Sequence, residues 1–136
     1  MGARRRGREA ALQMLCQMDV SGESAEDTIR KYWLHLSASK EGEAFANRIV
    51  RAFESERDLI DGAIRGVSHH WRLERMTVVD RNILRLGACE LIQIDEIPPR
   101  VTLNESVELA RRFGSEGSTG FVNGLLDRIA ADQQKA

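Results

Sequence analysis

The chain has 136 residues, of which 42% are hydrophobic and 30% charged, with a formal net charge of -1 at neutral pH. This length corresponds to about one globular domain, and the apolar fraction is too high for a wholly disordered chain. No stretch approaches the roughly 18 consecutive apolar residues that a transmembrane helix needs. These features argue against a membrane protein and predict a single domain that covers residues 1–136.

The N-terminus concentrates the positive charge of an otherwise nearly neutral chain. Four arginines lie within the first eight residues, namely Arg4, Arg5, Arg6 and Arg8. Such a cluster can open a secretory signal, but polar side chains interrupt residues 9–19, which therefore cannot form its apolar core. Cys16 and Cys89 have neither zinc nor redox-motif spacing and are expected to be reduced. We therefore expect a cytoplasmic protein with one concentrated basic surface.

Apolar residues recur at helical spacing through the first half of the chain and predict three helices. The first helix covers residues 3–20. The second covers residues 25–36, with Ser24 as its N-cap. A single long helix is then predicted from residue 41 to residue 66. The cluster His69–His70–Trp71 indicates a break or a short extra turn after it.

Three further helices are predicted in the second half. Thr77 and Asp80 resemble a capping box that begins a helix, which Pro98–Pro99 ends. A T-x-x-E capping box at residues 102–105 begins the next helix. The last helix covers residues 118–131. Six or seven amphipathic helices with short connections predict an all-α bundle without a domain linker.

The dipeptide Asn123–Gly124 lies inside the last helix, although this dipeptide is also typical of a β-hairpin turn. Helix is favoured, because the flanking arms are too short for a stable hairpin and no partner strands are predicted. A glycine inside a helix costs about 1 kcal/mol relative to alanine. We therefore expect a structural reason for Gly124, such as the close approach of a neighbouring helix.

The sequence offers no pattern for catalysis, a metal or a cofactor. His69 and His70 lack a cysteine or carboxylate at ligand spacing, so a surface or half-buried pair is favoured over a metal site. Cys16 and Cys89 lie within predicted helices without a nucleophile signature and are interpreted as packing residues. The glycines of residues 114–124 match neither nucleotide-binding motif. We predict a non-enzymatic protein.

The N-terminal arginines are the strongest chemical signal. They lie at or before the first turn of a predicted helix, whose free backbone N–H groups also favour anions. Arginine presents a planar fork of donors that fits phosphate and stacks on bases. This pattern favours contact with several phosphates and an affinity that falls with salt. A disordered basic tail without a defined partner is the alternative.

Several motifs resemble those of the NusB family in order and spacing. They are residues 4–15 (RRRGREAALQML), 71–75 (WRLER), 79–87 (VDRNILRLG) with Glu90 and Leu91, 97–98 (IP), 104–110 (NESVELA) with 113–114 (FG), and 121–127 (FVNGLLD). Each motif is modest alone, but together they cover nearly the whole chain. The match is weakest at residues 22–43.

This resemblance implies an all-helical fold of two packed helical sub-bundles. It also implies recognition of boxA-type single-stranded RNA in transcripts of ribosomal RNA operons. The family acts with NusE, a protein of the small ribosomal subunit, and with other Nus factors on RNA polymerase, in transcription antitermination. Neither a cofactor nor catalysis is implied.

The resemblance further implies roles for particular residues. The implied RNA-binding residues are Arg4, Arg5, Arg6, Arg8, Glu74, Arg85 and Phe121. The ring of Phe121 can stack on an unpaired base, with core packing as the alternative. Asp80 falls near the surface for the partner protein. Cys16 and Cys89 stand where the family often has Tyr, and Gly117 where it can have Asp, so RNA affinity or preference is expected to differ here.

Two other functions remain open. A NusB-like domain also precedes some ribosomal RNA cytosine methyltransferases. The sequence after the NusB-like motifs has no room for a methyl-donor-binding domain, so an enzyme is expected only if the chain is a fragment. The second alternative is an interaction protein that forms a homodimer and binds no RNA.

Overall fold

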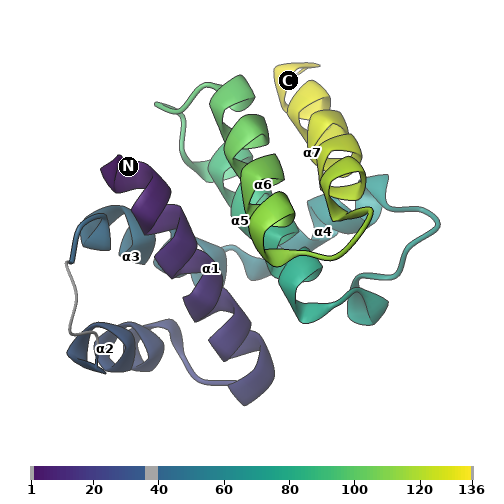
Figure 1. Ribbon diagram of the computed structural model, residues 1–136. Helices are drawn as coiled ribbons and strands as arrows, with labels where there is room; N and C mark the ends of the chain where they lie inside the picture. The colour runs from purple at the N-terminus through teal and green to yellow at the C-terminus, as the bar shows by residue number, and fades with distance from the viewer. Residues whose placement is uncertain (1, 36–39, 136) are drawn as a thin grey trace.

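The computed structural model describes residues 2–35 and 40–135 (Figure 1). These residues form seven α-helices and one 3-10 turn, and they contain no β-strand. The elements are α1 (Ala3–Ser21), α2 (Ala25–His35), α3 (Glu43–Ser55), α4 (Arg57–Val67), η1 (Leu73–Arg75), α5 (Val78–Gln93), α6 (Pro99–Phe113) and α7 (Ser118–Lys135). The predicted all-α fold is confirmed, although residue 36 of the predicted second helix lies outside the described residues. Within the described part of the chain, no helix is long and apolar enough to cross a membrane.

The helices pack as two sub-bundles that meet at α5, as the resemblance implies. Helices α1, α2 and α3 contact one another on one side, whereas α4, α6 and α7 each contact α5 on the other (Figure 1). Helix α5 also contacts α1 and α3, and so joins the two halves.

The central position of α5 follows from its sequence. Every residue from Asn82 to Glu90 is buried, so no face of this stretch is left for water. A helix buried on all sides belongs in the middle of a bundle. Its start is the predicted one, because Thr77 Oγ1 accepts a hydrogen bond from the backbone N–H of Asp80 at 3.1 Å.

The predicted long helix at residues 41–66 is wrong, because the chain breaks at Glu56 into α3 and α4. Glu56 has φ -118° and ψ 32°, which are not helical values. No proline or glycine marks the break, and the apolar spacing continues through it. The cause is tertiary: α3 packs on α1, whereas α4 packs on α7. A straight helix could not reach both sub-bundles.

The start of α6 also differs from the prediction. The helix begins at Pro99 with Pro98 as its N-cap, so residues 102–105 are no capping box. Proline is suited to the first helical position, because its missing N–H would have no partner there. Thr102 is buried instead, and its hydroxyl donates to a carboxylate oxygen of Glu90 at 2.9 Å.

The dipeptide Asn123–Gly124 is helical, as predicted, but the close helix approach expected at Gly124 is wrong. A Cβ added at Gly124 meets no heavy atom within 4 Å. The close approach occurs at Gly87 of α5, where a Cβ would lie 2.5 Å from Leu126 Cδ1 and 3.0 Å from Ser106 Oγ. Gly87 therefore lets α6 and α7 approach α5.

We expect Gly87→Ala to lower the free energy of unfolding by about 1–3 kcal/mol, because the added Cβ would lie 2.5 Å from Leu126 Cδ1 and Leu126 is itself fully buried. The control, Gly124→Ala, should raise it by up to about 1 kcal/mol through helix propensity. Urea denaturation followed by circular dichroism measures both. Equal stability of Gly87→Ala and wild type would contradict the assigned contact.

Candidate nucleic-acid interface

The exposed first turn of α1 carries three of the expected RNA-binding arginines, Arg4, Arg5 and Arg6. Arg5 donates to both carboxylate oxygens of Glu105, with N–O distances of 2.9 and 2.7 Å. This hydrogen bonding lowers the pKa of Glu105. Arg6 lies 2.9 Å from a carboxylate oxygen of Glu41. The turn is therefore less positive than its sequence indicates, but exposed salt bridges contribute only about 0–1 kcal/mol and can exchange for phosphate.

Arg8 does not belong to this surface, because only 2% of it is exposed. Its guanidinium donates to both oxygens of Glu90, with distances of 2.7 and 2.9 Å, and lies over the ring of Phe45. Glu90 is itself fully buried in α5. Arg8 thus holds α1 against α5, which the basic sequence pattern did not reveal.

Arg85 is likewise buried rather than displayed, with 5% exposed. It donates to both oxygens of Asp61 in α4, with distances of 2.9 and 3.0 Å. A nitrogen of Arg85 also lies 3.4 Å from Asp19 of α1. Its guanidinium covers the ring of Phe53 at 5.0 Å from the centroid. In this structure Arg85 connects three helices, and its expected place on an RNA-contacting surface is not seen.

Asp19 is the second carboxylate, after Asp61, that lies close to Arg85. Its partial burial acts to raise the pKa, but hydrogen bonds from Arg81 and Asn82, each 2.8 Å long, outweigh burial and lower the pKa of Asp19 below its usual 3.8. The ionised carboxylate is therefore the form that joins the end of α1 to the start of α5.

Glu74 is exposed on the turn η1, between α4 and α5. Arg65 donates to its carboxylate at 2.8 Å, and this hydrogen bond lowers the pKa of Glu74. Glu74 is accessible to a ligand, although one of its oxygens already has a partner.

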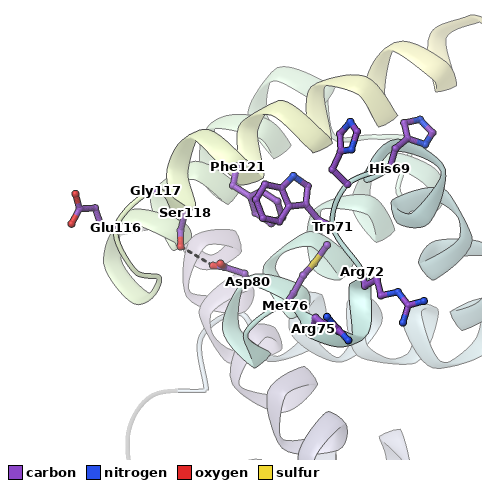
Figure 2. Close-up of a pocket in the computed structure, with 11 residues that line it drawn as sticks. His69, Trp71, Arg72, Arg75, Met76, Asp80, Glu116, Gly117, Ser118 and Phe121 are labelled. Atoms are coloured by element: carbon purple, nitrogen blue, oxygen red, sulfur yellow. Dashed lines mark hydrogen bonds between the residues drawn. The ribbon is translucent and has the colours of Figure 1, made fainter.

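Phe121 and Asp80 lie together in a groove of about 910 Å³ between η1 and the start of α7 (Figure 2). The lining residues are His69, His70, Trp71, Arg72, Arg75, Met76, Asp80, Glu116, Gly117, Ser118 and Phe121. Asp80 accepts a hydrogen bond from the hydroxyl of Ser118 at 2.8 Å. The ring of Phe121 is half-buried and packs edge-to-face on Trp71, with centroids 5.6 Å apart. The structure thus brings together an expected RNA residue and an expected partner-protein residue.

The groove also contains residues to which the sequence analysis assigned no role. Trp71 is 59% exposed, and Arg72 and Arg75 are exposed beside it. Neither arginine forms a salt bridge within the described part of the chain. The sequence signals for this groove are the family motif at residues 71–75 and an aromatic residue next to two histidines outside the predicted helices.

A second groove, of about 410 Å³, is mainly apolar and lies between α1, the start of α5 and the end of α6. It includes Cys16 and Val79, and the exposed side chains Val20 (76%) and Phe113 (42%) lie along it. Burial raises the pKa of the Cys16 thiol, which is therefore protonated at neutral pH. Both grooves include a residue from the first turn of α5, Asp80 in the first and Val79 in the second.

No three His, Cys, Asp or Glu side chains gather as metal ligands would in residues 2–35 and 40–135. Cys16 and Cys89 are both free thiols, and burial raises the pKa of Cys89 to about 12. The two grooves present hydrogen-bonding, charged and aromatic side chains.

Comparison with known proteins agrees with this geometry. The NusB family model matches residues 5–131. Transcription antitermination protein NusB of Sorangium cellulosum is 52% identical over 130 residues, which are 96% of this chain and 93% of that protein. The chain belongs to the NusB family. Its relatives are named for transcription antitermination, which is a binding role, and the prediction of a non-enzymatic protein agrees with this membership.

Solved NusB structures share the fold. NusB of T. maritima has a TM-score of 0.83 at 35% identity, over 98% of this chain and 97% of the other. The NusB fold also occurs in a crystal structure of antitermination factors NusB and NusE in complex with dsRNA, with a TM-score of 0.82 at 26% identity. That match covers 96% of this chain and 97% of the other.

We expect Arg8→Met to lower the free energy of unfolding by about 3–5 kcal/mol, because Glu90 is left charged and buried. The matched control is Arg5→Met in the same cluster, whose exposed salt bridge should contribute less than about 1 kcal/mol. Chemical denaturation of both variants measures the difference. Equal losses would refute the distinction between a structural and a surface arginine.

The hydrogen bonds that Asp19 accepts from Arg81 and Asn82 should make the stability of the protein depend on pH. Because the folded pKa of Asp19 is lowered, its stabilisation is complete above the unfolded pKa and disappears as the pH falls through the folded value. We expect Asp19→Asn to cost roughly 1–3 kcal/mol at pH 7 and progressively less below about pH 4. Urea midpoints from pH 7 to pH 2.5 test this, with exposed Asp132→Asn as control. A constant difference across the range would contradict it.

Proposed function

We propose that this NusB-family protein binds boxA-type single-stranded RNA of ribosomal RNA operon transcripts together with NusE. It then acts with other Nus factors on RNA polymerase to promote transcription antitermination in the cytoplasm. Family membership supports the general role. The observation that carries the RNA assignment is the groove in which Trp71 and Phe121 lie beside the exposed Arg72 and Arg75, which form no salt bridge with any other residue that the structure describes.

The proposed RNA surface has two parts. The first is the exposed turn of α1, where Arg4, Arg5 and Arg6 contact phosphates. Phosphate displaces Glu105 and Glu41 from Arg5 and Arg6 at little cost, because these bridges are exposed. The second part is the groove with Phe121, beside Glu74 on η1.

Arg8 and Arg85 have a structural role in this proposal. Both guanidiniums already bind two carboxylate oxygens in the interior. Contact with RNA would require breaking a buried ion pair, which leaves a carboxylate uncompensated at a cost of about 3–5 kcal/mol. Their contribution is to hold α1 and α4 on α5, so that the exposed arginines and η1 are correctly placed.

We propose that NusE binds at Asp80 and at the apolar groove that contains Val79. Exposed Val20 and Phe113 form the kind of apolar patch that marks protein contacts. A solved NusB–NusE complex with dsRNA supports a joint role of the two proteins. The small, protonated Cys16 leaves this groove open where a larger aromatic would fill part of it.

The test is binding of a fluorescent boxA-like RNA and a scrambled RNA at two salt concentrations, with and without NusE from the same organism. We expect boxA-like RNA to bind more tightly, NusE to strengthen binding and salt to weaken it. The triple variant Arg4→Ala/Arg5→Ala/Arg6→Ala should bind with a weaker salt dependence. The negative slope of log affinity against log salt should become shallower by about 0.7 for each phosphate that the variant no longer neutralises.

Arg30→Ala is the matched control, since Arg30 is an exposed arginine of α2 whose salt bridge is local. It should bind RNA as wild type does. If neither RNA binds even with NusE present, the proposed function is wrong, and a size that increases with concentration would then favour the homodimer.

A further inference from the structure

Trp71 is the more exposed of the two aromatic rings in the groove. It is 59% exposed, whereas the chain's other tryptophan, Trp33, is 6% exposed and donates its indole N–H to Asn47. The segment that carries Trp71 is ordered by a backbone hydrogen bond from its N–H to Ser68 at 2.9 Å. A large aromatic held in place but left in water is typical of a binding surface.

The edge-to-face contact with Phe121 sets the orientation of the indole ring of Trp71. The two ring planes meet at 82° with centroids 5.6 Å apart, so Phe121 covers at most one face of the indole. Phe121 is itself half-buried and packs against the hydrophobic core. Trp71 is therefore the more accessible ring for stacking in this groove, and Phe121 supports it from the core side.

The charges around the indole are separated. Arg72 and Arg75 follow it on the η1 side of the groove (Figure 2). On the α7 side, Glu116 points away from the rings and Asp80 is held by Ser118 (Figure 2). A ring flanked by two exposed arginines matches single-stranded nucleic acid, in which bases stack on aromatics while the backbone needs cations.

We infer that Trp71 stacks on an unpaired RNA base, that Arg72 and Arg75 contact the adjoining phosphates, and that Phe121 is a positioning residue for the indole. This inference rests on the proposed RNA binding and assigns the stacking contact within it to Trp71. Carboxylates at Asp80 and Glu116 disfavour a phosphate on the α7 side, so the RNA backbone lies toward η1.

Tryptophan emission tests the contact directly in the full chain with NusE and a boxA-like RNA. Trp33 is buried, so a change of emission on RNA addition reports on Trp71. Stacking should quench that emission, and Trp71→Ala should abolish the quenching. The same variant should weaken RNA binding about 5- to 150-fold, while Trp71→Phe should restore most of the affinity.

Abasic substitutions along the RNA locate the stacked base. At one position, loss of the base should weaken binding to wild type but not to Trp71→Ala. Phe121→Ala should change the emission of Trp71 before RNA is added and weaken binding less than Trp71→Ala does. Leu34→Ala is the control, because Leu34 is an exposed apolar residue on α2, away from the groove.

The outcomes separate the two proposals. If boxA-like RNA binds but the emission is unchanged and Trp71→Ala binds normally, this inference is wrong and the proposed function stands. If NusE alone changes the emission and RNA adds nothing, the indole is a protein contact, which also overturns the inference. If no RNA binds under any condition, both proposals fail.

Discussion

Helix α5 is buried along its whole middle, yet that stretch contains the charged residues Arg85 and Glu90. A buried charge costs several kcal/mol unless an opposite charge meets it with good geometry. Arg8 of α1 meets Glu90, and Asp61 of α4 meets Arg85, each through two hydrogen bonds. These pairs limit how α1 and α4 can slide or rotate on α5. They thereby help to set the position of one sub-bundle relative to the other.

The candidate interface depends on the same pairs. With Arg8 turned inward, the preceding turn of α1 leaves Arg4, Arg5 and Arg6 exposed beside α3 and α6. With α4 held by Arg85, the segment that follows α4 returns along the start of α7 and places the indole against Phe121 (Figure 2). The two parts of the surface therefore have a fixed relation to each other.

Much of the fold was predictable, because helical periodicity and the cap at Thr77 are local properties of the sequence. The predictions that are wrong concern features that depend on how the helices pack. The break at Glu56 has no local signal, and it forms because α3 and α4 pack in different sub-bundles. Similarly, Gly87 and Gly124 are both helical glycines, but only Gly87 lies at a close crossing.

The sequence by itself determined the all-α class, the basic character of the N-terminus and membership of the NusB family. Only the tertiary structure decided which arginines reach the surface. Arg5 and Arg8 are the same residue type, yet Arg5 pairs with Glu105 at the surface and Arg8 pairs with Glu90 in the core. Their partners are distant in sequence, so exposure and pairing depend on how the helices pack.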